Sequence, residues 1–160
     1  MAFNLQTFTL FHVMVSLAGI ITGLVVAGGL VSGRRLVGWA SVFLVTSAAT
    51  SVTGFGFPSN VLLPSHVVGS ISLVVLGVAA IALAKRLAGP WRRIYSGGVV
   101  AATYLNCFVL VAQLFRRLPD LAQLAPTQSE PPFAIAQLLV LVSFVWLGVS
   151  ADSGMRSSAR

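Results

Sequence analysis

The chain has 160 residues, of which 57% are hydrophobic and only 8% are charged, and its mean hydropathy is +0.96. Soluble domains usually carry about 25% charged residues, so this composition excludes an ordinary soluble enzyme, a disordered regulator and a nucleic-acid-binding domain. The formal net charge of +7 comes from ten Lys and Arg residues against three acids, Asp120, Glu130 and Asp152. The sequence predicts a multi-pass membrane protein whose main partner is the lipid bilayer.

Five apolar stretches are long enough to span a hydrocarbon core about 30 Å thick, which takes about 20 residues of helix. None of them contains Asp, Glu, Lys or Arg. The stretches are 8–31, 36–57, 67–84, 94–115 and 133–150. The first is too long for the core of a signal peptide and has no basic residue before it, so we expect it to remain as a helix. The sequence therefore predicts an all-α, polytopic bundle of five transmembrane helices, forming a single domain over residues 1–160.

Turn-forming residues separate the five stretches. Glycine or proline occurs in each of the short connections, and Pro58-Ser59-Asn60 is expected to stop the second helix. The longest connection, 116–132, is rich in proline. Within it, the spacing of Leu118, Leu121 and Leu124 predicts one short amphipathic turn on the membrane surface.

The basic residues predict how the chain is oriented in the membrane. Only Arg116 and Arg117 fall on one side of a five-span arrangement. The other eight fall on the opposite side: Arg34, Arg35, Lys85, Arg86, Arg92, Arg93, Arg156 and Arg160. Because Lys and Arg accumulate on the cytoplasmic side, we expect a periplasmic N-terminus and a cytoplasmic C-terminus. The net charge is then an orientation signal and not a surface for nucleic acid.

Two segments, 12–23 and 66–77, align without a gap. Histidine, valine, serine and glycine recur at the same offsets, and a basic pair and a tryptophan follow each segment. This pattern predicts a duplicated helical hairpin plus one added helix, although aliphatic helices also resemble one another by chance. In the repeat, His12 and His66 lie at matched depths. Each heads a helical face that should pack on a neighbouring helix: Ser16, Gly19 and Gly23 in the first, and Ser70, Leu73 and Gly77 in the second.

Polar side chains of the spans gather in the half of the membrane that this orientation makes the outer one. They are His12, Ser16, Thr50, Thr53, His66, Ser70, Asn106, Gln113 and Gln137. Serine and threonine often bond a carbonyl of their own helix, and asparagine and glutamine join helices, so each residue also has a purely structural interpretation. Their concentration nevertheless favours a site that opens outward. The loop 125–132 and the segment 53–58 are either a lid over that site or ordinary connections.

Two histidines at matched depth suit axial ligation of the iron of a b-type haem, with Arg116 and Arg117 pairing with its propionates. A quinone or a lipid head group fits the same region. The predicted cofactor-binding residues are His12, His66, Asn106, Gln113, Arg116, Arg117 and Gln137, of which His12 and His66 are the metal ligands. No protease, serine hydrolase or nucleotide-binding motif occurs, so no enzyme class is indicated. The single cysteine, Cys107, is expected to be a small buried hydrophobic residue.

The chain also resembles an uncharacterised family of small proteobacterial inner-membrane proteins. The resemblance rests on the helix containing His12, Gly19 and Gly23, the Gly33-Arg34-Arg35 turn, the segment 53–58, Pro64-Ser65-His66 and the segment 125–132. It covers most of the chain. It implies a location in the bacterial inner membrane and assigns no activity.

Three functions remain open at this point. The first is binding of a cofactor or lipid-soluble ligand in the outer half, most concretely b-type haem or a quinone in a redox role. The second is a non-catalytic accessory or assembly subunit of a membrane complex, in which the polar residues only join helices. The third is a small channel or carrier that works as a homo-oligomer.

Overall fold

The computed structural model describes residues 4–58 and 64–157. In this part of the chain the structure is helical, without strands, and its helices are α1 (Leu5–Val31), α2 (Val37–Gly54), α3 (Pro64–Ala84), α4 (Trp91–Arg117), α5 (Pro119–Leu124) and α6 (Pro131–Ser157). All except α5 are long and apolar enough to cross a membrane. The predicted all-α bundle is confirmed, and its five long helices fit a multi-pass membrane protein. The predicted stop at Ser59-Asn60 and the cation Arg160 lie outside the described residues.

The helix ends differ from the predicted spans by a few residues. The first helix begins at Leu5, where the Asn4 side chain accepts a hydrogen bond from the Gln6 amide at 3.1 Å. The second ends at Gly54, three residues before the end of the predicted span 36–57, because the Gly56 amide bonds back to the Thr53 carbonyl and closes a turn. The last continues to Ser157, well past residue 150. Polar residues extend a membrane helix easily, since its backbone bonds are internal.

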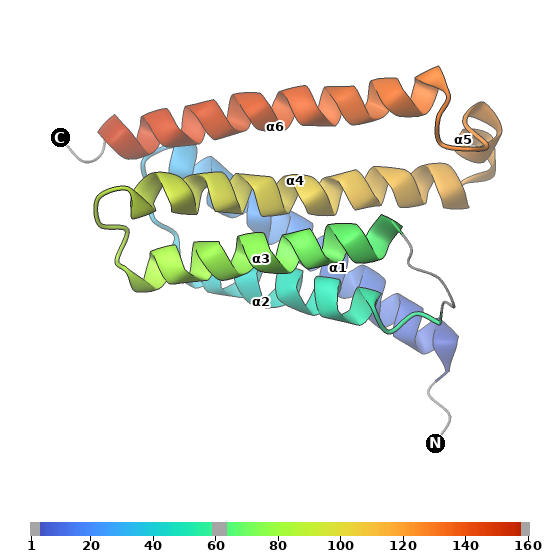
Figure 1. Ribbon diagram of the computed structural model, residues 1–160, viewed down its shortest axis with the longest axis horizontal. Helices are drawn as coiled ribbons and strands as arrows, with labels where there is room; N and C mark the ends of the chain where they lie inside the picture. The colour runs from blue at the N-terminus through green and yellow to red at the C-terminus, as the bar shows by residue number, and fades with distance from the viewer. Residues whose placement is uncertain (1–3, 59–63, 158–160) are drawn as a thin grey trace.

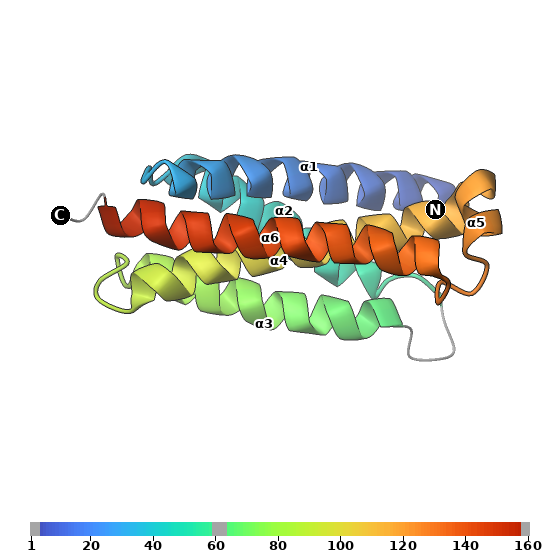
Figure 2. The ribbon, with the colours of Figure 1, turned by 90° about the horizontal axis from the view of Figure 1, so that it is seen from above.

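The helices form two antiparallel hairpins and one added helix (Figures 1 and 2). The first hairpin pairs α1 with α2 and the second pairs α3 with α4. In the centre, α4 contacts α1, α3 and α6. The short helix α5 lies at one end of the bundle (Figure 1), and its leucine-bearing turn was predicted. We call this the α5 end.

The opposite end of the bundle is the basic end. It contains the two hairpin turns and the last turn of α6, together with most of the described cations: Arg34, Arg35, Lys85, Arg86, Arg92, Arg93 and Arg156. The α5 end has only Arg116 and Arg117. The two chain ends point to opposite ends of the bundle (Figure 1). The structure therefore separates the cations along the helix axis as the sequence predicts.

A close approach of three helices lies on the glycine face of α1. A Cβ atom added at Gly23 would lie 2.5 Å from Thr103 Oγ1 and 2.8 Å from the ring of Phe43. These neighbours come from α4 and α2, so three helices meet at this glycine. The predicted packing of the His12, Ser16, Gly19 and Gly23 face against neighbouring helices is confirmed, because small residues allow membrane helices to approach closely.

The corresponding prediction for α3 is wrong. Ser70 and Gly77 are exposed, and nothing lies within 4 Å of a Cβ added at Gly77. The buried face of α3 is instead formed by Ser72, Leu76, Ala79 and Ala82. The reason lies in α4, where Gly98 brings the helix so near to Ala79 that an added Cβ would sit 3.1 Å from the alanine Cβ. The two hairpins thus pack through different faces, and their common origin stays a prediction.

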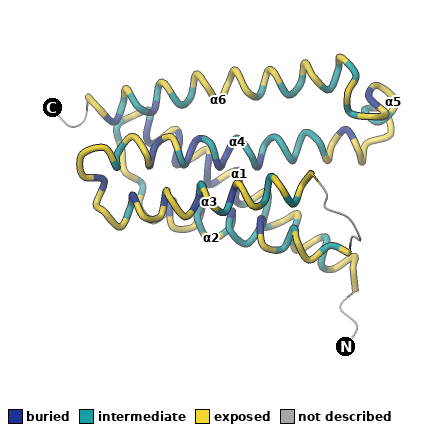
Figure 3. Tube along the Cα trace, in the orientation of Figure 1, coloured by how far each residue is buried: buried dark blue, intermediate teal, exposed yellow. Residues whose placement is uncertain are grey.

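The last helix is attached to the bundle mainly at the basic end. Most of α6 is exposed, and its two buried residues are Ala151 and Met155 (Figure 3). At Gly154 the helix is so close to α1 that an added Cβ would overlap the carbonyl oxygen of Val31. In addition, Arg92 Nη1 donates a hydrogen bond to the Met155 carbonyl at 3.3 Å. The broad apolar surface of α6 is the kind of surface that lipid covers.

Candidate functional site

A cavity of about 420 Å³ lies between α1, α2, α3 and α4 in the half of the bundle nearer the α5 end. Its volume is within the range of about 300–1,000 Å³ that is typical of small-molecule sites. The apolar wall includes Leu17, Ile20, Val68, Leu105, Val109 and Leu110. These residues were not predicted from the sequence. Val109 and Leu110 could have been found, because they lie three and four residues after Asn106 and so share its face of the helix. We call this cavity the pocket.

The floor of the pocket is an interhelical hydrogen bond. Asn106 Nδ2 donates to Ser47 Oγ at 3.0 Å, and both residues are buried. Gly19 makes room for this contact, because a Cβ added there would lie 3.1 Å from the Ser47 hydroxyl oxygen. From this level toward the α5 end, α1 and α4 diverge (Figure 1), and the pocket occupies the space between them.

The polar residues of the pocket lie at three depths. On α4, Asn106, Gln113 and Arg117 share one face, and the rise of an α-helix puts them about 10 Å and then about 6 Å apart. On α1, His12 is seven residues from Gly19, which also corresponds to about 10 Å. His12 and Gln113 therefore lie between the floor and the rim, nearer to the rim, and Arg116 and Arg117 form the rim.

The ring of His12 is held by a hydrogen bond to α2. Its Nδ1 lies 2.8 Å from Thr53 Oγ1, and the Thr53 hydroxyl in turn donates to the Ala49 carbonyl at 2.7 Å. That hydroxyl has one proton, so when it donates to the Ala49 carbonyl His12 Nδ1 carries the hydrogen of the bond to Thr53, and when it donates to Nδ1 the imidazole has the other tautomer. In the first case Nε2 of the neutral ring is the acceptor. Within residues 4–58 and 64–157 no group hydrogen-bonds this nitrogen.

Most hydroxyl groups along the pocket are already engaged. Ser16 donates to the His12 carbonyl at 2.7 Å, and Thr50 donates to the Thr46 carbonyl at 2.9 Å. Ser51 does the same toward Ser47. Such bonds within one helix satisfy the hydroxyl proton locally. The side-chain groups of the lining without a protein partner in the described chain include His12 Nε2, the Gln113 amide, the guanidinium groups of Arg116 and Arg117, and the hydroxyls of Ser65 and Ser72.

Five of the seven predicted site residues line the pocket: His12, Asn106, Gln113, Arg116 and Arg117. Gln137 lies elsewhere and joins α6 to α4, since its Nε2 donates to the Phe108 carbonyl at 3.1 Å. His66 is also outside the lining, and its ring stacks on Phe55 with the ring centroids 5.3 Å apart.

The lining therefore contains one imidazole, whereas bis-histidine ligation of haem iron needs two. The residues of the pocket do not fit a b-type haem held in that way. In the described chain there is also no group of three or more His, Cys, Asp or Glu side chains placed to hold a metal ion. His12 is still a hydrogen-bonding group for an organic ligand.

Half of the predicted lid lies on the pocket. Gly54, Phe57 and Pro58 are part of its lining, whereas the loop 125–132 contributes no residue to it. That loop is tied to the end of α4, where Gln128 Nε2 donates to the Ala112 carbonyl at 2.6 Å. Gln128 itself has a positive φ of 59°, which fixes a tight turn.

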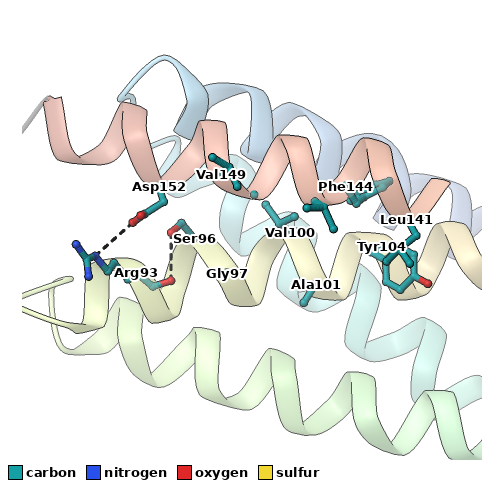
Figure 4. A pocket seen from close by; sticks show the side chains of 12 residues that line it. Arg93, Ser96, Gly97, Val100, Ala101, Tyr104, Leu141, Phe144, Val149 and Asp152 are labelled. Atoms are coloured by element: carbon teal, nitrogen blue, oxygen red, sulfur yellow. Dashed lines mark hydrogen bonds and ion pairs between the residues drawn. The ribbon is translucent and has the colours of Figure 1, made fainter. Parts of the chain in front are cut away.

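A second hollow of about 440 Å³ lies between α4 and α6 (Figure 4). Its wall is mostly apolar, and its polar groups toward the basic end are paired with one another. Arg93 Nε lies 3.5 Å from an Asp152 carboxylate oxygen, and the Ser96 hydroxyl donates to the Arg93 carbonyl at 3.1 Å. This groove therefore offers fewer free hydrogen-bonding groups than the pocket.

Comparison with known protein families, with curated proteins and with solved structures finds no match to the chain. A function must therefore be sought in its own side chains. The pocket is the place where they are concentrated, because four helices form its wall and polar groups without a protein partner lie along that wall.

Proposed function

We propose that this protein binds a lipid-soluble ligand in the pocket. The observation that carries the proposal is the convergence of His12, Gln113, Arg116 and Arg117 on one apolar-walled cavity. Polar groups inside a membrane bundle are costly unless they serve packing or a ligand. The hydroxyls of Ser16, Thr50 and Ser51 are used within their own helices. The groups that remain unpartnered are those that a ligand would engage.

A ligand with an apolar body and a small polar head fits this distribution. Its body would lie along Leu17, Ile20 and Val109, and its head would lie between Gln113 and the arginines at the rim. A quinone is one molecule of this kind, since its carbonyl oxygens accept hydrogen bonds from amide and guanidinium donors. A quinone there would give the protein a redox role.

We further infer that the pocket opens on the periplasmic side of a bacterial inner membrane. The support is the separation of cations: seven of the described Lys and Arg side chains lie at the basic end, and two lie at the α5 end. Since the side rich in Lys and Arg is cytoplasmic, the N-terminus is periplasmic and the C-terminus cytoplasmic. The family resemblance supports the same membrane.

Photolabelling of the purified protein in nanodiscs tests the proposal. Diazirine-bearing long-chain alcohol and fatty acid probes would be crosslinked and located by peptide mass spectrometry. We expect at least one probe to label pocket residues. Val109→Trp, which fills the pocket, should abolish that labelling. The matched control is Val74→Trp, because Val74 is 67% exposed on the outer surface of α3, and it should leave labelling unchanged.

Labelling that spreads over lipid-facing residues and ignores Val109→Trp would overturn the proposal. An accessory subunit would give that result together with a stable membrane-protein partner in a pull-down. A channel would give it together with ion flux in liposomes that falls in Asn106→Leu. A Soret band that is lost in both His12→Ala and His66→Ala would restore the haem assignment.

A further inference from the structure

The rim of the pocket has a charge imbalance that suggests what kind of head group it takes. Arg116 and Arg117 both line the pocket, and no carboxylate is part of its lining. Neither guanidinium forms an ion pair with an acid in residues 4–58 or 64–157. A cation beside a low-dielectric cavity attracts an anion more strongly than one in open water does.

The acids at the α5 end are not placed to neutralise these arginines. Glu130 is engaged within its own loop, where Oε1 accepts hydrogen bonds from the Thr127 amide at 3.1 Å and from the Thr127 hydroxyl at 2.8 Å. Its other oxygen accepts from the Ser129 amide. Asp120 lies in the first turn of α5, outside the lining.

At the basic end one carboxylate is paired, and the other described cations of that end form no ion pair within the described chain: Arg34, Arg35, Lys85, Arg86 and Arg92. There Asp152 pairs with both Arg93 and Arg156. The groove between α4 and α6 thus has a cation at its edge that already has a carboxylate partner (Figure 4), whereas the pocket has two cations without one. The unpaired cations of the basic end line neither of these two cavities, whereas Arg116 and Arg117 line the pocket, and this position favours an external anion there.

We propose that the ligand of the pocket is a single-chain amphiphile with an acidic head group. The head, a carboxylate or a phosphate, is bound by Arg116 and Arg117 at the rim, and the chain runs inward toward Asn106. Guanidinium groups suit both acids, because they donate parallel hydrogen bonds to two oxygens. This inference rests on the proposed function and names the chemical class of its ligand.

The residues below the rim position the head group. Gln113, about one helical turn deeper than Arg117, donates an amide hydrogen to an anion that lies above it. His12 is at the same depth, and in the tautomer with its hydrogen on Nδ1 the neutral ring presents an acceptor nitrogen, which disfavours an anion at that level. An acidic head is therefore retained at the rim, where its charge stays next to the polar surface of the membrane.

The size of the pocket indicates one chain. A volume of about 420 Å³ is at the lower end of the range of about 300–1,000 Å³ for small-molecule sites. The distance along α4 from Asn106 to Arg117 corresponds to about 16 Å of helix, so an extended chain reaches the floor with its head at the rim. The floor bond between Asn106 and Ser47 ends the site.

Competition against the photoreactive probes tests the head group. The protein in phosphatidylcholine nanodiscs would be titrated with dodecanoate, dodecyl phosphate, dodecanol and inorganic phosphate. We expect both acidic amphiphiles to bind about tenfold or more tightly than dodecanol, which is the size of one charge-assisted interaction. Inorganic phosphate should not compete, because it has no chain to occupy the apolar wall.

Substitution of the rim arginines is the second test of the acidic head group. The double variant Arg116→Gln/Arg117→Gln should reduce the preference for the acids to about twofold or less, and Arg116→Lys/Arg117→Lys should restore most of it. The matched control is Arg34→Gln/Arg35→Gln, which removes the same charge at the basic end and should leave the preference unchanged. Size-exclusion profiles and circular dichroism would verify that each variant is folded.

The possible failures are distinguishable. Equal binding of dodecanol and dodecanoate, with pocket labelling intact, overturns the acidic head group and leaves the proposed function standing. That result would favour a neutral ligand such as a quinone. Displacement of the probe by inorganic phosphate alone overturns the requirement for a chain. Absence of pocket labelling with every probe overturns the proposed function itself.

Discussion

Asn106 on α4 donates a hydrogen bond to Ser47 on α2, and the contact joins the two hairpins inside the apolar part of the bundle. Ser51, one turn further along α2, bonds only to the Ser47 carbonyl of its own helix. Among the serines and threonines of α2 in the described chain, Ser47 is the residue whose side chain hydrogen-bonds across the two hairpins.

A double-mutant cycle at Asn106→Ala and Ser47→Ala measures that contribution. We expect a coupling free energy of about 0.6 kcal/mol, with an upper value of about 1.7 kcal/mol, because hydrogen bonds between membrane helices have this size. Unfolding of the detergent-solubilised protein by SDS gives the four free energies. Ser143, which bonds only to its own helix, is the control: Ser143→Ala should be additive with Asn106→Ala.

Gly23→Ala should destabilise the bundle, because the new methyl group would overlap Thr103 and Phe43. The expected loss is about 1–3 kcal/mol, the usual cost of overpacking. Thermal unfolding in detergent measures it. Gly28→Ala in the same helix is the control, since nothing lies within 4 Å of its added Cβ, and that variant should be as stable as the wild type or slightly more stable. Equal loss in the two variants would contradict the close approach at Gly23.

Gly154→Ala should release the basic-end half of α6 from α1. The added Cβ would overlap the carbonyl oxygens of Val31 and Leu30, and a backbone atom cannot move aside as a flexible side chain can. We expect faster hydrogen exchange near Met155 and a lower midpoint of thermal unfolding. Gly148→Ala, whose added Cβ makes an ordinary contact of 3.6 Å with Val100, is the matched control and should behave as the wild type.

The loop before α6 should lose its order as the pH falls. Partial desolvation by itself raises the pKa of the Glu130 carboxyl, but hydrogen bonds from Thr127 and Ser129 outweigh it and leave this pKa below the ordinary value for glutamate. A carboxyl whose pKa is lower in the folded chain stabilises it fully above the unfolded pKa. That stabilisation disappears as the pH drops through the folded pKa. Limited proteolysis between Ala125 and Glu130 across the acid range should show increasing cleavage.

Glu130→Gln separates this effect from general acid denaturation. The amide cannot ionise, so cleavage of the loop in this variant should be high at neutral pH and depend little on acid. Asp120→Asn in α5 is the control, because the Asp120 side chain makes no hydrogen bond or ion pair in the described chain and the variant should retain the wild-type profile. A wild-type loop that resists cleavage equally at all pH values would refute the role of Glu130.

The sequence predicts the spans well because two simple properties define them. A membrane helix must be long and must avoid charge, and all five stretches satisfy both requirements. It also predicts much of the pocket, since Asn106, Gln113 and Arg117 share one face of α4 by spacing alone. The extra residues at the helix ends were not predictable from apolar length, because polar side chains such as Gln6 continue a helix into the interface.

Contacts that depend on a second helix could not be predicted from the sequence. In α3, small and aliphatic residues occur on every side, so no polar contrast marks the face that packs, and Gly98 of α4 selects Ala79. His66 was assigned by analogy with His12, but its neighbour is Phe55, which lies just beyond the end of α2. The Gln137 side chain hydrogen-bonds to the Phe108 carbonyl on α4. None of these partners can be identified from the spacing within one helix.

The exposure of α6 has a consequence for how the chain tolerates change. No residue of α6 lines the pocket, and two of its residues, Ala151 and Met155, are buried. Selection for a ligand would therefore act on α1 to α4 and leave the sixth helix free to exchange one aliphatic side chain for another. A saturation-mutagenesis map should divide at the loop 125–130, with a restrictive first part and a permissive last helix in which Gly154 is the exception.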